Sequence, residues 1–168
     1  LGIENVGAIV TRGVLIDVAK FKGVDQLPPR YEITPAGLKG ALQRENVQIR
    51  SGDMVIIHTG WSSLWMKDNA KYGDSEPGIG LAAGQMLVDA EVVVVGADTW
   101  GVEVMPNPDA SLSAPVHQLF LARNGIYLHE NLITADLARD SVYEFVYMFA
   151  PLRLKGATGS PGNPIAIR

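Results

Sequence analysis

Hydrophobic residues along the chain come in short runs, each bounded by turn-forming residues. The runs at residues 13–18, 54–59 and 91–98 are rich in valine and isoleucine, which predicts buried strands. None of them is long enough to cross a bilayer. In residues 142–151 aromatic side chains recur at every second position, and this alternation predicts a longer strand with one aromatic face.

Helical patterns lie between the predicted strands. Thr34 precedes Pro35, an N-cap residue followed by proline at the first helical position. Further helices are predicted at residues 81–90, 115–124 and 134–139, the second of them ended by Asn124-Gly125. A strand is predicted at 126–130, and two strands around a turn in the tail "LRLKGATGSPGNPIAIR". Strands alternating with helices indicate an α/β fold with a partly parallel sheet, to which the tail adds antiparallel strands.

The composition is that of a globular protein. With 168 residues, 47% of them apolar and 19% charged, the chain is expected to form one domain over residues 1–168. A net charge of −4 without a basic block argues against nucleic acid or an acidic membrane as a partner. The absence of cysteine excludes disulfides, thiolate metal sites and a cysteine nucleophile, and it is compatible with a cytoplasmic location. Because the chain opens on "LGIENVGAIVTRG" without an initiator methionine, we expect the domain to be truncated at its N-terminus.

Two candidate ligands lie in the stretch "PVHQLFLARNGIYLHENL". A helix from His117 to Asn124 descends about 10 Å, and a strand from Ile126 to Glu130 climbs about 13 Å. His117 and Glu130 are therefore expected to finish side by side. His129 is expected on the opposite face, because neighbouring residues of a strand point in opposite directions.

These two residues alone do not specify a metal site. A histidine near a helix start is often structural, and a catalytic zinc generally has three protein ligands. The chain contains no H-E-x-x-H, H-x-H or C-x-x-C motif. Residue patterns therefore leave a metal site at His117 and Glu130 open.

Five segments, in order, resemble a known family. They are "RGVLIDVA", "GDMVIIHTGW", "VGADTWGVEVMP", "PVHQLFLARNGIYLHENL" and "LRLKGATGSPGNPIAI". The family is that of the metal-dependent cyclase-like hydrolases, which include bacterial kynurenine formamidase and isatin hydrolase. The similarity is greatest to the longer bacterial members that are labelled only as cyclase family proteins.

The resemblance implies a fold, a chemistry and site residues. The fold is a swivelling β/β/α domain with layered sheets, and members hydrolyse a small amide, formamide or lactone with zinc or manganese. His117 would bind metal or hold the developing oxyanion as a catalytic residue, and Glu130 would bind metal. Many members form homo-oligomers. The family motif H-x-G-T-H-x-D-x-P, which supplies the principal metal ligands, is absent from this sequence.

Other polar residues and one tryptophan are candidates of lower rank. Asp98 and Glu103 follow a predicted strand, where ligands collect in α/β proteins, but they also suit an ordinary solvated loop. Trp61 is either a wall for an aromatic substrate or a core residue. For Asp17 and His58, in buried-strand patterns, structural hydrogen bonding is expected before chemistry.

Two alternatives to a hydrolase stay open. The chain could be a non-catalytic module, degenerate or cleaved, that binds a small molecule or a partner subunit. It could also act structurally, through an exposed aromatic loop at residues 60–80, since long loops in compact domains commonly carry binding functions.

Overall fold

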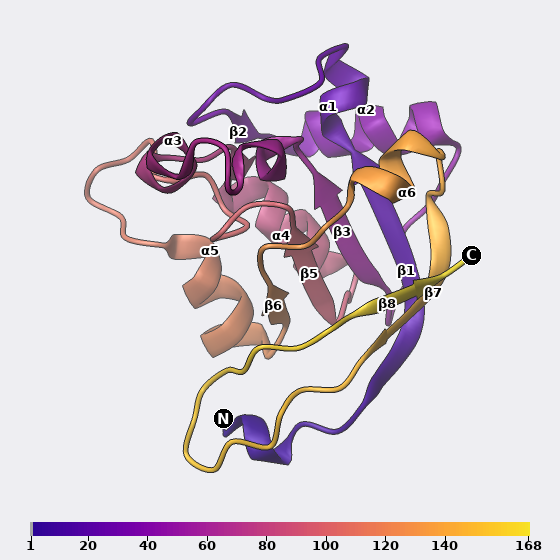
Figure 1. Cartoon of the computed structure of the whole chain (residues 1–168), viewed down its shortest axis with the longest axis vertical. Helices are drawn as coiled ribbons and strands as arrows, with labels where there is room; N and C mark the ends of the chain where they lie inside the picture. Colours follow the sequence, from indigo (N-terminus) through magenta and orange to yellow (C-terminus); the bar gives the residue numbers. More distant parts are fainter. Residues whose placement is uncertain (1) are drawn as a thin grey trace.

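The computed structural model describes residues 2–168 and contains a six-stranded mixed sheet (Figure 1). The strand order is β6-β5-β3-β1-β7-β8. Strands β1, β3, β5 and β6 are parallel, whereas β7 and β8 are antiparallel to their neighbours. The strands are β1 (Ile9–Asp17), β3 (Met54–His58), β5 (Val94–Ala97), β6 (Tyr127–His129), β7 (Glu144–Phe149) and β8 (Ile165–Ile167). A second, two-stranded sheet pairs β2 (Glu32–Ile33) with β4 (Gly78–Ile79).

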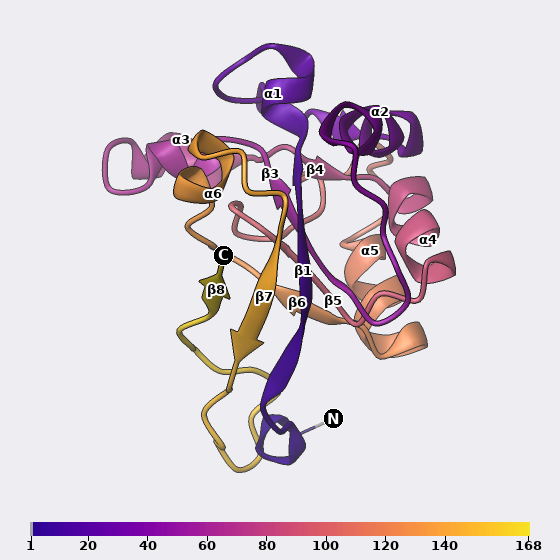
Figure 2. The ribbon, with the colours of Figure 1, turned by 90° about the vertical axis from the view of Figure 1, so that its right-hand side faces the viewer.

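The main helices cover one face of this sheet (Figure 2). They are α2 (Pro35–Glu45), α4 (Leu81–Asp89) and α5 (Pro115–His117), the last continuing as the π-helix η3 (Gln118–Asn124). Each parallel crossover steps in the same direction across the sheet, so right-handed connections place all their helices on the same side. The larger core cluster lies between these helices and the strands.

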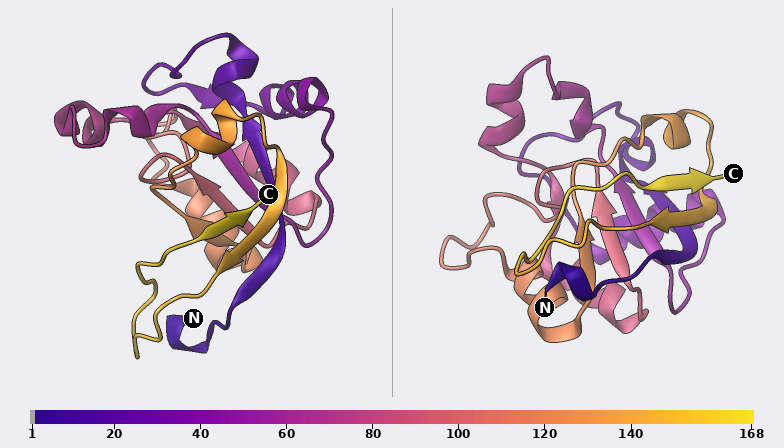
Figure 3. Two further views of the ribbon diagram at one scale, coloured as in Figure 1. Left: turned by 45° about the vertical axis from the view of Figure 1, so that its right-hand side comes forward. Right: turned by 60° about the horizontal axis from the view of Figure 1, so that its bottom comes forward.

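Short elements complete the chain, and the second face of the sheet is less covered. The short elements are η1 (Ile3–Asn5), α1 (Val18–Lys22), η2 (Trp61–Leu64), α3 (Asn69–Asp74) and α6 (Ala135–Arg139). A smaller cluster that includes Leu15, Phe145 and Tyr147 packs on the second face, which the C-terminal segment crosses (Figure 3, right). Cavities of about 490 and 500 Å³ remain beneath that segment.

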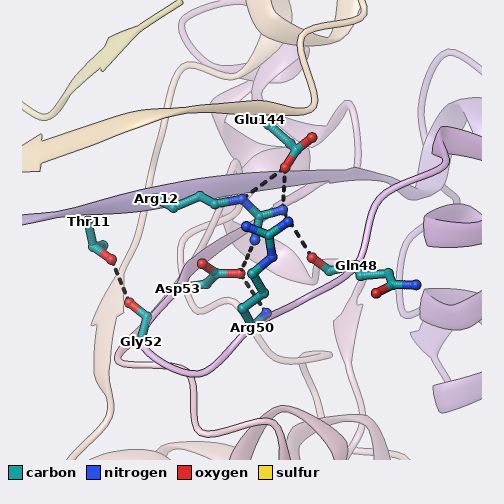
Figure 4. Close-up of polar contacts among 7 residues, drawn as sticks. All are labelled: Thr11, Arg12, Gln48, Arg50, Gly52, Asp53 and Glu144. Carbon is teal, nitrogen blue, oxygen red and sulfur yellow. Dashed lines mark hydrogen bonds and ion pairs between the residues drawn. The ribbon is translucent and has the colours of Figure 1, made fainter.

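An ion-pair network joins the antiparallel strand β7 to the parallel part of the sheet (Figure 4). Arg12 on β1 donates to Asp53 Oδ2 at 2.7 Å, to Glu144 Oε1 at 2.9 Å and to the carbonyl oxygen of Gln48 at 3.1 Å. Asp53 also accepts a hydrogen bond from the Arg50 backbone at 2.7 Å. The network therefore fixes the turn before β3 against β1 and β7.

The predicted α/β class with a mixed sheet is confirmed, and all of the main strands are present. Gly125 has a left-handed φ of 64°, as predicted for the end of the helix. The helix is of π type from Gln118 onward, which its sequence pattern does not indicate. One of the two predicted tail strands is wrong. Residues 152–154 are irregular and pair with no strand, and Leu152 and Leu154 are exposed.

The predicted exposed aromatic loop is also wrong in most of its length. Residues 60–80 fold into η2, α3 and β4, and both Trp61 and Tyr72 are buried. Trp65, with 57% of its surface exposed, is the exception. Within residues 2–168, no helix has the length and apolar character needed to span a bilayer.

Candidate functional site

The carboxyl ends of the parallel strands carry several polar side chains, most of them buried, with Glu130 partly exposed. Asp17 ends β1, His58 ends β3, Asp98 follows β5 and Glu130 follows β6. These strand ends meet at one edge of the sheet, which is where ligands bind in open α/β folds. The edge is therefore the first place to search for a site.

His117 lies between two glutamates at this edge. Its Nδ1 atom is 2.6 Å from Glu103 Oε1, and its Nε2 atom is 3.3 Å from Glu130 Oε1. Glu103 is fully buried, whereas the side chains of His117 and Glu130 are 27% and 38% exposed. The structure thus brings His117 and Glu130 side by side, with both side chains partly exposed to solvent.

Hydrogen bonds to both glutamates raise the pKa of His117 to about 9, the bond to Glu103 contributing most. Without a metal, the imidazole is therefore protonated at neutral pH and bridges the two carboxylates. A cation between Nε2 and Glu130 would take the place of that proton.

A fifth carboxyl group, Glu76, lies buried near the same edge. Its Oε2 atom accepts a hydrogen bond from the Trp100 backbone at 2.7 Å, and its Oε1 atom has no hydrogen-bond partner among the described residues. Burial raises the pKa of Glu76 to about 8, with smaller contributions from Glu130 and Asp98. Glu76 is therefore mostly protonated at neutral pH.

An open cleft of about 950 Å³ lies beside Asn131, the neighbour of Glu130 in sequence, whereas Glu130 itself lines the two smaller cavities. Tyr72 and Asn131 line it, and the Tyr72 hydroxyl donates to Asn131 Oδ1 at 2.6 Å. Burial, assisted by Glu76, raises the pKa of Tyr72 to about 12, so this hydroxyl remains a donor. The other lining residues include Asp17, Lys20, Arg44, His58, Ser62, Trp65 and Ile133.

The spacing of His117 and Glu130 suits a metal ion. Nitrogen and oxygen ligands of a tetrahedral zinc lie about 3.3 Å from one another, which matches the distance from His117 Nε2 to Glu130 Oε1. Among residues 2–168, however, no group of three or more His, Cys, Asp or Glu side chains is arranged to hold a metal ion. The pair therefore fits part of a metal site, and its role as a ligand pair stays a prediction.

The three residues predicted to line a substrate pocket are all fully buried. Asp98 accepts hydrogen bonds from the Thr59 and Gly60 backbones, and the Trp61 indole donates to the Tyr72 carbonyl oxygen. None of the three, Asp98, Trp61 or Glu103, lines any of the three cavities described above. In this structure all three side chains are buried away from the surfaces of these cavities.

Three other residues named from the sequence are placed as follows. Asp17 accepts a hydrogen bond from the Lys20 backbone at the start of α1, and it also lines the large cleft. His58 Nδ1 is 2.6 Å from Thr134 Oγ1. His129 points to the second face of the sheet, where its Nδ1 atom is 2.6 Å from the Tyr147 hydroxyl.

Sequence patterns did not indicate Glu76, Tyr72 or Asn131. Glu76 is buried because its backbone bridges to Met105, a contact between segments far apart in sequence. The available signal for Glu76 was a charged residue inside the apolar stretch "SEPGIGLAAG". Asn131 carried a weaker signal, since it directly follows the candidate ligand Glu130.

Comparisons with known proteins agree with this architecture. The model of the Cyclase family ("Putative cyclase") matches residues 3–104. A solved structure described as a novel cyclase is 36% identical, with a TM-score of 0.88, over 100% of this chain and 56% of that one. No curated protein matches the sequence.

Two more distant solved structures share the fold. Isatin hydrolase A from Labrenzia aggregata, bound to benzyl benzoate, is 24% identical with a TM-score of 0.79, over 99% of this chain and 65% of that one. A predicted metal-dependent hydrolase from Bacillus stearothermophilus is 22% identical with a TM-score of 0.64, over 94% and 63%. The chain thus spans between 56% and 65% of the length of these relatives. Because the family model covers well over half of the chain and a 36% identical structure aligns with all of it, the chain belongs to the cyclase family.

Proposed function

We propose that this chain carries part of the active site of a metal-dependent hydrolase that acts on a small amide, formamide or lactone. The observation that supports it best is the placement of His117 between Glu103 and Glu130, with Nε2 and Glu130 Oε1 at the spacing of metal ligands. Family membership and the hydrolases among its structural relatives point the same way.

In this proposal His117 Nε2 and Glu130 hold a divalent ion, zinc or manganese. Such an ion lowers the pKa of a bound water to about 7 and polarises a carbonyl oxygen. When Nε2 is free of metal and protonated, His117 can instead donate a hydrogen bond to an oxyanion. Histidine and carboxylate donors suit zinc and manganese alike, so the donor set does not choose between them.

The substrate would enter through the cleft beside Asn131. Its volume of about 950 Å³ is ample for a small molecule. Tyr72 and Asn131, joined by a hydrogen bond, both line this cleft. We propose that this pair orients the substrate and limits water around it, while Trp65 supplies an aromatic wall at the exposed end.

The rest of the ligand set would come from outside residues 2–168. Catalytic zinc generally takes three protein ligands, and the relatives are longer than this chain. A homo-oligomer is also proposed, as a second source of site residues.

The test combines metal binding with hydrolysis. Zinc and manganese are titrated into the chain and into the complete product of its gene, and hydrolysis of formamide, amide and lactone substrates is then assayed. We expect His117→Gln and Glu130→Gln to abolish both metal binding and hydrolysis. His129→Gln is the matched control, since His129 lies on the other face of the sheet. Equal metal binding by His117→Gln and the unchanged protein would refute the proposal.

A non-catalytic binding module is the second candidate. The lack of a metal-binding group of three or more residues within the described part of the chain favours it. It predicts that neither the chain nor the complete gene product binds metal or hydrolyses these substrates, while a small molecule still binds in the cleft.

A further inference from the structure

The Glu103 side chain is hydrogen-bonded to the start of the helix that carries His117. Helix α5 begins at Pro115, and the preceding Ala114 provides no side-chain cap. Glu103 takes over that role: its Oε2 atom accepts from the Val116 backbone at 3.1 Å, and its Oε1 atom accepts from the His117 backbone at 2.9 Å. Both oxygens are therefore fixed by the helix that the carboxylate caps.

The same Oε1 atom fixes the imidazole ring. It lies 2.6 Å from His117 Nδ1. Because this oxygen also accepts from the His117 backbone N–H, it faces the ring as an acceptor, and Nδ1 carries the proton and donates it to this bond. The Nε2 atom is thereby left to face Glu130 at 3.3 Å. A ring held at one nitrogen by an immobile acceptor has one orientation and one neutral tautomer.

The backbone on either side of Glu103 is strained and tightly packed. Val102, fully buried, has a φ of 64°, a left-handed conformation that β-branched residues rarely adopt. Gly78 packs directly against it, since a Cβ atom there would lie 2.3 Å from the Glu103 carbonyl carbon. Local strain of this kind persists where the surrounding structure fixes it, and it clusters at functional sites.

We propose that Glu103 is a positioning residue that fixes the tautomer and orientation of His117, so that Nε2 is presented as the ligand atom. The inference rests on the proposed function for its purpose, but its geometry concerns only this chain. Glu103 acts through His117 and contacts neither substrate nor metal. Carboxylates that accept a hydrogen bond from a metal-binding histidine commonly raise metal affinity in this way.

The variant Glu103→Met tests this proposal. Glu103→Gln would not, because a glutamine oxygen at the position of Oε1 could still accept the Nδ1 proton. Methionine has nearly the size of glutamate but no oxygen, so Nδ1 loses its acceptor while Glu130 still faces Nε2. We expect His117 to adopt the opposite neutral tautomer, with the proton on Nε2, and zinc affinity to fall about 10- to 100-fold.

Two readouts follow the tautomer and the affinity separately. Zinc affinity is measured by calorimetry on the chain or on the complete product of its gene, according to which of the two binds zinc. The tautomer is read without metal, from nitrogen-15 spectra of labelled histidines at a pH above the His117 pKa of about 9. Glu76→Met is the control, because it places the same side chain at another fully buried glutamate that makes no hydrogen bond to His117.

The outcomes separate the two proposals. If the unchanged protein keeps the proton on Nδ1 and Glu103→Met moves it to Nε2, the positioning role stands, even if no form binds zinc and the proposed function fails. If zinc binds and Glu103→Met changes neither tautomer nor affinity, the positioning role is refuted while the proposed function survives. Equal losses of affinity in Glu103→Met and Glu76→Met would also refute it, as would a proton on Nε2 in the unchanged protein. Circular dichroism and thermal unfolding check that both variants fold.

Discussion

Glu76 makes the stability of this protein depend on pH in a way that one substitution should remove. Its side chain is fully buried, and one of its two oxygens has no hydrogen-bond partner among residues 2–168. Burial raises its pKa from 4.5 to about 8. The folded protein therefore keeps the Glu76 proton over a range in which the unfolded chain has lost it.

The sign and size follow from proton linkage. Between pH 4.5 and about pH 8 the folded state binds more protons than the unfolded state, so the free energy of unfolding falls as pH rises. For one group the slope is about 1.4 kcal/mol per pH unit. Over this range the total is about 5 kcal/mol, a large part of the stability of a typical domain. Glu76→Gln does not titrate and loses this slope.

The assay is urea unfolding of the unchanged protein and Glu76→Gln at a series of pH values across this range. We expect similar stability at the acidic end, since the neutral carboxylic acid and the amide are nearly isosteric, and a more stable variant at the alkaline end. Taking the difference between the two proteins cancels the contributions of other groups. Parallel curves, with a difference that is constant in pH, would refute the assignment of a raised pKa to Glu76.

Three further predictions concern the sheet edge and the ion-pair network. The pKa of His117 is raised to about 9, so protonated His117 stabilises the fold fully below about pH 6.5, and this effect is lost as the pH rises through 9. Across that range, the difference in free energy of unfolding between the unchanged protein and His117→Gln should shrink as the pH rises. Gly78→Ala places a Cβ atom 2.3 Å from the Glu103 backbone, and we expect a loss of about 1–3 kcal/mol or more in urea unfolding. Gly159→Ala is the control, because a Cβ atom there meets open space and the backbone is not left-handed. Arg12→Met leaves the buried Asp53 carboxylate without its ion pair, which should lower the melting temperature and cost about 3 kcal/mol.

Much of the fold could be predicted from local patterns. Buried strands read as valine- and isoleucine-rich runs, and the carboxyl edge of a parallel sheet follows from their alternation with helices. The failed tail strand, residues 152–154, shows the limit of this reasoning. Its apolar alternation fits a strand, but a strand also needs a neighbour with free backbone groups, and β7 pairs instead with β8.

Part of the site could also be predicted, for a geometric reason. His117 and Glu130 belong to one helix–turn–strand unit, in which rise per residue is known and the positions of both ends can be calculated. That holds although the helix is of π type from Gln118. The calculation needs only the local chain, so no tertiary contact had to be guessed.

Glu103 and Glu76 required information of a different kind. Each becomes buried through a bridge to a distant segment: Ile79 pairs with Glu103, and Glu76 pairs with Met105. The two bridges lie next to each other. They bring Glu103 into contact with the imidazole of His117, and they bury Glu76 nearby with one oxygen that has no hydrogen-bond partner among the described residues. Segment by segment, the sequence leaves Glu103 open between a site residue and a solvated loop residue and does not single out Glu76, because the bridges belong to neither segment alone. If the site works as proposed, its tuning residues are therefore set by loop pairing at the sheet edge, while its ligands are set by local secondary structure.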